Sequence, residues 1–191
     1  MNADGRLARG EATRASLLDA ATTIVARRGV EALTHRAVAT EAGVSHALVA
    51  YHFPTADRLR RATLAHAGDR LTNRLAELLS DSPDPAGVPD VAGDLAVTMV
   101  TDLRDESVTL YELMAQATRD PELHSTLDDL ICRIADLIEP LSGDHRLAAT
   151  AATALLGVIL TAMAMGRDQY VDILRAQVVA LVERFDPHLT R

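Results

Sequence analysis

The 191-residue chain is 48% hydrophobic, so it is long and apolar enough to bury a core without the help of disulfides. Its single cysteine, Cys132, excludes an internal disulfide, and together with the lack of a secretory leader it predicts a reducing, cytoplasmic location. The net charge of −8 conceals an asymmetry: residues 1–74 hold 11 Arg against 7 acidic residues, and residues 75–191 hold 8 Arg against 20.

A basic N-terminal part on an acidic body is what a DNA-binding module attached to a larger domain would show. A chance asymmetry of solvated charge explains the same numbers equally well. The aromatic content is only 3%, and no segment alternates apolar and polar residues at period two. These features predict an all-α protein.

The first 80 residues show the start and stop signals of four helices. Apolar residues at helical spacing, followed by Arg27, Arg28 and Gly29, predict a first helix over about 11–28. The remaining signals, in chain order, are Thr34 as a cap, Gly43 as a stop, Ser45 as the next cap, and Thr55 with Asp57 at the start of a helix over about 56–80.

The rest of the chain is also predicted to be helical. The Pro-, Gly- and Ser-rich run at 80–90 predicts a loop, and Asp120 with Pro121 predicts a helix start. Cys132 lies in an apolar stretch and is expected to be buried as a small hydrophobe. The helices expected after the loop span about 89–104, 107–118, 145–165 and 168–185. Between the second and third of these, a helix that starts at Pro121 carries apolar residues from Leu123 to Leu137 and is closed by Pro140 with Gly143.

Residues 147–166 contain no charged residue, which meets the length criterion for a membrane span. Ala, Thr and Gly dominate the first half of this segment, and its flanks carry no clear Arg bias. We therefore expect a helix buried between other helices or between subunits, and no membrane association.

Two short helices joined by the sequence EAGVS form the skeleton of a helix-turn-helix, whose second helix enters the major groove of DNA. The spacing predicts that five apolar side chains pack inward, namely Leu33, Val38, Val44, Val49 and Phe53. His46, Ala47, Ala50 and Tyr51 then face outward, on a surface without acidic residues.

The sequence LTHRAVATEAGVSHALVAYHFPTADRL, residues 33–59, resembles the DNA-binding segment of the TetR family of bacterial transcriptional regulators. The resemblance covers about residues 11–60, and beyond them it extends only to the number and length of the helices. It implies an N-terminal three-helix DNA-binding domain over 1–55 and a larger helical domain for effector binding and dimerisation over 56–191, about nine helices in all.

The resemblance implies roles for individual residues. Thr34 matches a phosphate-contacting position and Arg36 a position that contacts a base or a phosphate. Tyr51 and His52 match an aromatic-His pair near the DNA backbone. The opening turn of the reading helix is formed by Ser45, His46, Ala47 and Leu48, and for Leu48 base contact and simple packing remain equally open.

Two positions depart from the family pattern. Ala50 stands where a Tyr is usual, and Ala56 stands where a Lys is frequent, so two phosphate anchors are missing. Arg14 and Arg58 are candidate replacements, and the alternative is that they are ordinary solvated arginines. If nothing replaces the anchors, the chain would be a helical ligand-binding or interaction protein with a degenerate DNA-binding module.

In the body, the resemblance implies a homodimer built from the last two helices and an effector pocket inside each subunit. The alternative is that the apolar residues of these helices pack only within their own subunit and form no interface. The interface candidates are Leu155, Ile159, Val171, Leu174, Val178, Leu181 and Phe185. The pocket candidates are Met99, Tyr111, Met114, Gln116, Arg119 and Met163.

The sequence contains none of the common catalytic or metal-binding motifs, so we expect no enzyme, no metal and no cofactor. The predicted function is a cytoplasmic, homodimeric DNA-binding regulator, most simply a repressor. It would bind a palindromic operator in double-stranded DNA and would be released by a small-molecule effector.

Overall fold

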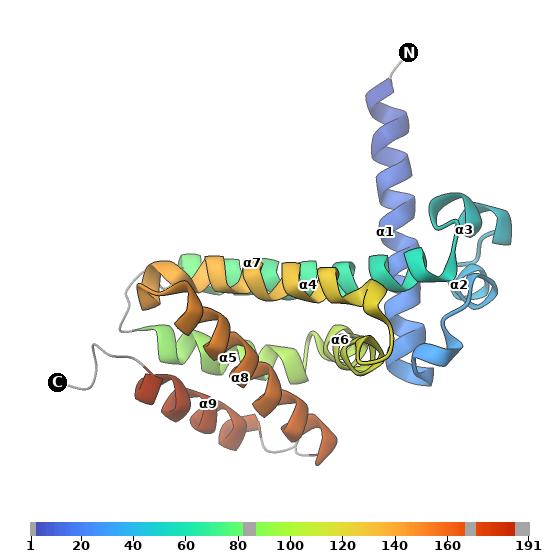
Figure 1. Cartoon of the computed structure of the whole chain (residues 1–191). Coiled ribbons are helices and arrows are strands. Elements are labelled where there is room, and N and C mark those ends of the chain that lie inside the picture. Colours follow the sequence, from blue (N-terminus) through green and yellow to red (C-terminus); the bar gives the residue numbers. More distant parts are fainter. Residues whose placement is uncertain (1–2, 82–86, 167–170, 186–191) are drawn as a thin grey trace. The chain divides into compact units, whose positions relative to one another are not determined.

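The computed structural model describes residues 3–81, 87–166 and 171–185, and within these ranges every regular element is a helix (Figure 1). The predicted all-α class is therefore confirmed. Residue contacts divide the chain into two units, one of residues 1–67 with 108–126 and the other of 68–107 with 127–191. The functional boundary expected at residue 55 stays a prediction, because the contacts divide the chain at a different point, inside the fourth helix.

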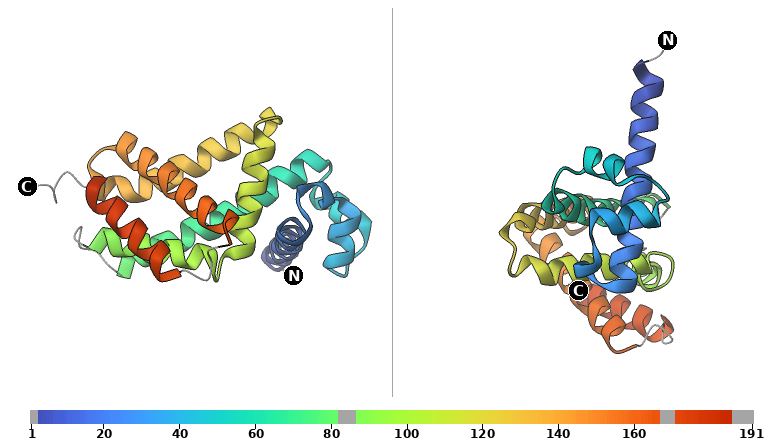
Figure 2. Two further views of the ribbon diagram at one scale, coloured as in Figure 1. Left: turned by 90° about the horizontal axis from the view of Figure 1, so that it is seen from below. Right: turned by 90° about the vertical axis from the view of Figure 1, so that its right-hand side faces the viewer.

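The first unit contains the N-terminal helices. The long first helix contacts two short helices that follow it, and the left-hand view of Figure 2 shows the first helix end-on with the short helices beside it. The elements of this unit are α1 (Ala3–Arg28), the 3-10 turn η1 (Val30–Ala32), α2 (His35–Glu41), α3 (His46–His52), the start of α4 (Ala56–Asp81), most of α6 (Arg104–Ala117), the 3-10 turn η3 (Pro121–Leu123) and the first residues of α7 (His124–Ser142).

The helix boundaries around the turn confirm the predicted caps. Thr34 Oγ1 accepts a hydrogen bond from the Ala37 amide, and Ser45 Oγ accepts one from the Leu48 amide at 3.2 Å. Gly43 has φ of +66°, which a residue with a Cβ rarely adopts. Since α1 begins at Ala3, it is longer than the helix predicted over 11–28: its first residues lack the apolar periodicity that the prediction used.

The core of the first unit joins α1 to the two short helices. Leu17, Leu18 and Ile24 of α1 are buried against it. Four of the five predicted inward residues, Leu33, Val38, Val49 and Phe53, are buried here, and Val44 is partly buried beside them. The inward face predicted from the spacing is thereby confirmed.

A second chain segment completes this unit. The hydroxyl of Thr109 donates to the backbone carbonyl of Thr22 at 3.1 Å, 87 positions away, and both residues are buried. The amide of Val30 donates to a carboxylate oxygen of Glu112 at 3.4 Å. Residues 108–126 are therefore tied to the N-terminal helices by buried as well as exposed contacts.

The second unit is a bundle of helices. It contains the end of α4, α5 (Val88–Val100), the start of α6, most of α7, α8 (His145–Ala164) and α9 (Val171–Phe185). The last helix packs on α5, and α8 contacts both of them (Figure 1). Arg175 of α9 donates hydrogen bonds to Asp94 and Asp90 of α5, and these hydrogen bonds raise the pKa of Arg175 above its usual value.

A close approach between α5 and α9 depends on Gly93. A Cβ built at this position would lie 2.9 Å from Val179 Cγ2 and 3.0 Å from Arg175 Cγ. Any side chain here would push the two helices apart or force their side chains to move. Glycine at residue 93 therefore permits the close packing of α9 on α5.

The prediction for Cys132 was wrong, because the side chain is exposed. The buried stripe of α7 runs through Leu130 and Ile134. Cys132 lies two residues from each of them, which corresponds to about 200° around a helix, so it faces away from the stripe. Apolar surroundings in the sequence did not indicate which side of the helix the thiol occupies.

Helix α8 is long and apolar enough to cross a membrane by length and composition, and it is the one described helix that meets both criteria. Only 28% of its most apolar 18-residue window is buried. Ala148, Ala152, Leu156 and Ile159 form the buried side. The exposed positions of α8 beyond Arg146 carry no charge and are not covered within their own unit; they are Thr150, Thr153, Gly157, Leu160, Thr161 and Ala164.

Candidate nucleic-acid interface and ligand cavity

The outward side of α3 carries the predicted reading residues. Ser45, His46 and Ala47 are exposed, Leu48 is half-buried, and Tyr51 is 79% exposed. The ring of His52 meets that of Tyr51 edge to face, with centroids 5.2 Å apart. Since no residue of α3 is acidic, nothing on the helix itself would repel phosphate.

Helix α2 contributes the other two predicted residues. Thr34 caps it through its hydroxyl oxygen, which leaves the hydroxyl proton available to a phosphate. Arg36 is exposed, and within the described residues no acidic side chain pairs with it. Both side chains are therefore accessible at the start of α2, as an anion-binding role requires.

Sequence reasoning missed a contact that joins the two short helices. His35 Nε2 donates a hydrogen bond to the backbone carbonyl of Phe53, the residue at the end of α3. The His35 ring also lies 5.9 Å from that of His46. No spacing rule pairs a side chain with a carbonyl 18 positions later, so only the structure could reveal it.

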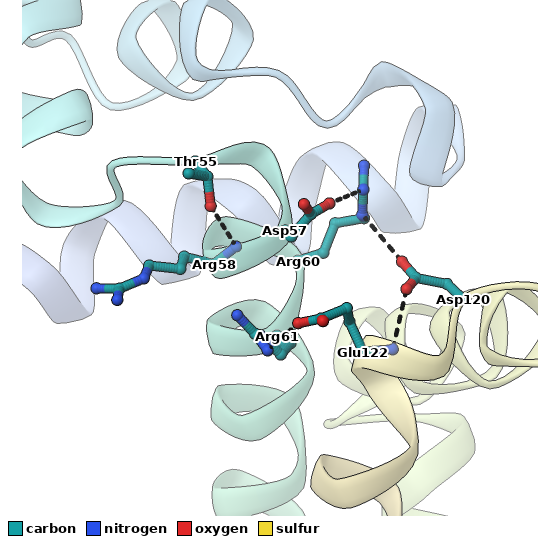
Figure 3. Close-up of polar contacts among 7 residues, drawn as sticks. All are labelled: Thr55, Asp57, Arg58, Arg60, Arg61, Asp120 and Glu122. Carbon is teal, nitrogen blue, oxygen red and sulfur yellow. Dashed lines mark hydrogen bonds and ion pairs between the residues drawn. The ribbon is translucent and has the colours of Figure 1, made fainter.

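Figure 3 shows that the arginines of α4 differ in their partners. Arg60 pairs with Asp57 and lies 3.8 Å from Asp120, and Arg61 pairs with Glu122. Arg58, by contrast, is exposed and pairs with no acidic side chain among the described residues, while its amide donates to Thr55 Oγ1. Of the three, Arg58 alone has an uncompensated charge to offer to DNA.

Arg14 of α1 is held at the edge of the same unit. Its guanidinium lies 5.4 Å from the ring centroid of Phe53, within range of a cation–π contact. The residue is exposed, so its charge remains accessible to solvent and to an anion. The structure thus keeps both candidate replacements for the missing anchors, Arg14 and Arg58, accessible. At the two positions where the sequence lacks the usual phosphate anchors, Ala50 is half-buried and Ala56 is exposed.

The six pocket candidates are distributed over both units. Met99 and Met163 belong to the second unit, where Met99 is buried and Met163 is half-buried. Tyr111, Met114, Gln116 and Arg119 belong to the first unit, and they range from buried to exposed in that order. The structure therefore does not bring the six together within one unit.

A cavity of about 120 Å³, partly open to solvent, lies in the second unit between the end of α4, α5, α7, α8 and α9. None of the six pocket candidates lines it. Sixteen of its seventeen lining residues are Ala, Val, Leu or Ile, and the other is Ser142. The sequence signal used for the pocket, flexible methionine, is absent from this lining, and short aliphatic side chains form it instead.

The interface candidates fall into four groups. Ile159, Leu174 and Val178 are buried within the second unit, because α9 packs on α5 and α8. Leu155 and Leu181 line the cavity and Val171 is half-buried, and the side chain of Phe185 lies outside the described residues. The interface candidates of α9 therefore lie mainly on the inward side of that helix. The outward apolar side chains are Leu160 of α8, 42% exposed, and Ile173 of α9, 53% exposed.

One group of side chains has the geometry to hold a metal ion. Potential ligand atoms of Asp136, Glu139 and His145 lie within 4.8 Å of one another. Both carboxylates are exposed, and His145 Nε2 lies 3.3 Å from Asp136 Oδ1. An ordinary surface ion pair explains this arrangement.

Two family models match successive parts of the chain. Residues 17–63 match the family model described as bacterial regulatory proteins, tetR family. Residues 83–185 match the model described as a tetracyclin repressor-like C-terminal domain. An HTH-type transcriptional repressor of Mycobacterium tuberculosis is 43% identical over 65 residues, which are 34% of this chain and 35% of that protein. The matched segment thus spans about a third of this curated relative.

Solved structures are similar over most of the chain. A member of the TetR family from Streptomyces coelicolor is 25% identical with a TM-score of 0.75, and the match covers 92% of this chain and 98% of that one. The multidrug binding protein EbrR, complexed with ethidium, is 26% identical with a TM-score of 0.70, covering 92% and 99%. The similarity includes the body, where the sequence alone showed only comparable helices.

Proposed function

Because the chain belongs to the TetR family of bacterial regulatory proteins, we propose that it is a sequence-specific DNA-binding repressor of transcription that responds to a small molecule. The observation that carries this proposal is the accessible, acid-free side of α3, capped by Ser45 and supported from behind by the core of the first unit. A helix presented in this way can enter a major groove with its first turn at the base edges.

The proposed contacts divide into two kinds. Arg36, Ser45, His46, Ala47 and Leu48 would contact bases. Thr34, Tyr51 and His52, with Arg14 and Arg58, would contact phosphates and fix the position of the protein on the duplex. The repressor of Mycobacterium tuberculosis, similar over the N-terminal segment, supports the choice of repression over activation.

We propose a homodimer that uses the uncovered side of α8 and α9. Leu160 and Ile173 are large apolar side chains that their own unit leaves exposed. A second copy would cover them and would also explain why the exposed side of α8 carries no charge from Thr150 to Ala164. On this view α8 is an interface helix of a cytoplasmic protein and not a membrane span.

In a dimer, the two α3 helices would lie about one turn of DNA apart. A small molecule bound in the second unit would favour a different spacing of the two helices, which no longer matches the major grooves of the operator. The complex of EbrR with ethidium shows that a structurally similar protein binds a small molecule. For this chain we place the effector in the aliphatic cavity of the second unit.

Selection of bound sequences from a random DNA pool tests the function directly. We expect a palindromic site that the purified dimer shifts in a gel, with affinity that falls as salt rises. A folded dimer that enriches no sequence would contradict the proposal. It would favour the alternative that the missing anchors at Ala50 and Ala56 suggest, a helical ligand-binding or interaction protein with a degenerate DNA-binding module.

A further inference from the structure

The cavity of the second unit has a lining that restricts the chemistry of its ligand. Side chains such as Leu75, Leu95 and Ile134 contribute only methyl and methylene groups, and no lining residue carries a charge or an aromatic ring. An ion entering such a space would lose its hydration without gaining an opposite charge. A planar aromatic cation would in addition find no ring to stack on.

The one polar side chain of the lining, Ser142, has a limited capacity left. Its hydroxyl oxygen lies 3.1 Å from the carbonyl of Asp144 and 3.4 Å from that of Glu139, so its proton is used on the backbone. The amide of Asp144 donates to the same oxygen at 3.4 Å. A hydroxyl oxygen has two lone pairs, so one acceptor site remains for a ligand.

We infer that this cavity binds an uncharged, compact aliphatic molecule that carries one hydroxyl group, whose proton is donated to Ser142. The volume of about 120 Å³ suits a small ring or a short branched chain, since a cavity of roughly 150 Å³ accepts benzene. The regulatory meaning of this ligand rests on the proposed function, because only in a DNA-binding regulator would it act as an effector.

Isothermal titration calorimetry with two matched probes tests the charge selectivity. Cyclopentanol and the cyclopentylammonium ion share one ring and differ in the charge of a single polar group. We expect cyclopentanol to saturate the full-length protein and to bind at least about 100-fold more tightly than the ammonium ion, because the cavity offers the ion no compensating charge. Equal or tighter binding of the ammonium ion would overturn the inference.

Two alanines of α8 provide a matched pair of variants. Ala151 and Ala149 are both half-buried, but only Ala151 lines the cavity. We expect Ala151→Phe to fill the space and to weaken cyclopentanol binding at least about tenfold, and Ala149→Phe to leave it unchanged. If Ala151→Phe dissociated the dimer and left cyclopentanol binding intact, the space would belong to the subunit contact and the inference would fail.

The role of Ser142 is tested with a probe that cannot donate a hydrogen bond. Ser142→Ala should weaken cyclopentanol binding about three- to tenfold, and it should leave the binding of cyclopentanone unaffected. An equal loss for both probes would overturn the assignment of the hydroxyl contact.

The titrations contain no DNA, so they are independent of the regulatory proposal. Selective cyclopentanol binding by a protein that enriches no operator would support the ligand class and remove the proposed function. Operator binding by a protein that takes up no cyclopentanol would do the reverse.

Discussion

His35 of α2 donates a hydrogen bond from Nε2 to the carbonyl oxygen of Phe53, and so ties the end of α3 to the helix before it. Phe53 is buried, and the guanidinium of Arg14 lies over its ring. The backbone at the end of the reading helix is thus held from two sides. This arrangement makes the orientation of α3 depend on a residue outside it.

We expect His35→Ala to lower the free energy of unfolding by about 1 kcal/mol, the usual net value of such a hydrogen bond. Operator affinity should fall as well, because α3 loses a constraint on its orientation. Urea denaturation and a DNA titration measure the two effects. His124→Ala is a matched control, because His124 Nε2 bonds to the carbonyl of Ala117 at 2.8 Å, away from α3. An equal loss of DNA affinity in both variants would contradict the specific role of His35.

The arginines of α4 provide a second matched comparison. Arg58→Ala should reduce the slope of log affinity against log salt by about 1.8, the value for two lost phosphate contacts, one from each subunit of the dimer. Arg61 is paired with Glu122 (Figure 3), so Arg61→Ala should change the slope little. Fluorescence anisotropy with labelled operator at several salt concentrations gives both slopes. Identical slopes for Arg58→Ala and the unaltered protein would remove Arg58 from the contacts.

The small apolar side chains of α3 predict contact with thymine methyl groups. Ala47 is exposed and Leu48 is half-exposed at the opening turn. Replacement of thymine by uracil at a contacted position should cost about 1 kcal/mol, roughly a fivefold loss of affinity. Single substitutions across the selected operator would locate the contacts. Affinity unchanged at every thymine would contradict this mode of reading.

The packing of α9 on α5 predicts that Gly93→Ala is destabilising. Its Cβ would lie within 3.0 Å of two side-chain carbons of α9, and such overpacking costs about 1–3 kcal/mol. Gly10→Ala in α1 is the control, because nothing lies within 4 Å of the added Cβ and the helix should gain up to about 1 kcal/mol. Thermal unfolding of both variants measures the difference. A Gly93→Ala protein as stable as the unaltered one would show that the helices separate easily.

The proposed dimer predicts a clear effect of charge on its face. Leu160→Asp and Ile173→Asp should each favour the monomer, because an unpaired carboxylate would be buried between the subunits. Thr118→Asp, at an exposed position of the first unit, should leave the dimer intact. Sedimentation velocity at micromolar concentration distinguishes the two species. If the unaltered protein itself sedimented as a monomer, the proposed dimer would be disproved.

The local signals around the helix-turn-helix were sufficient to predict its caps and its turn, because caps and turn glycines act over only a few positions. Ser45 and Gly43 illustrate this, since the cap and the left-handed turn occur where the sequence places them. Which side of α7 Cys132 occupies, and which group accepts the hydrogen bond of His35, depend on packing between distant segments. Periodicity alone carries no such information. Leu174 and Val178 show the same limit, since a stripe identifies an apolar side but not what covers it.

The cavity was missed for a related reason. Methionine was the sequence signal for an adaptable pocket, yet the lining consists of alanine and branched aliphatic side chains that also fill ordinary cores. Space between helices arises where several small side chains meet. Ala148, Ala151 and Ala152 do so on α8, together with Ala92 on α5.

The contact between Thr109 and Thr22 limits how this regulator could exchange parts with its relatives. A hybrid in which residues 1–67 were joined to a foreign body would lose the segment 108–126 that completes the first unit. Thr22, Val30 and Arg61 would then lose their partners Thr109, Glu112 and Glu122. Gene fusion or recombination at the end of the DNA-binding sequence would therefore transfer an incomplete module, unless the incoming body carried a matching segment.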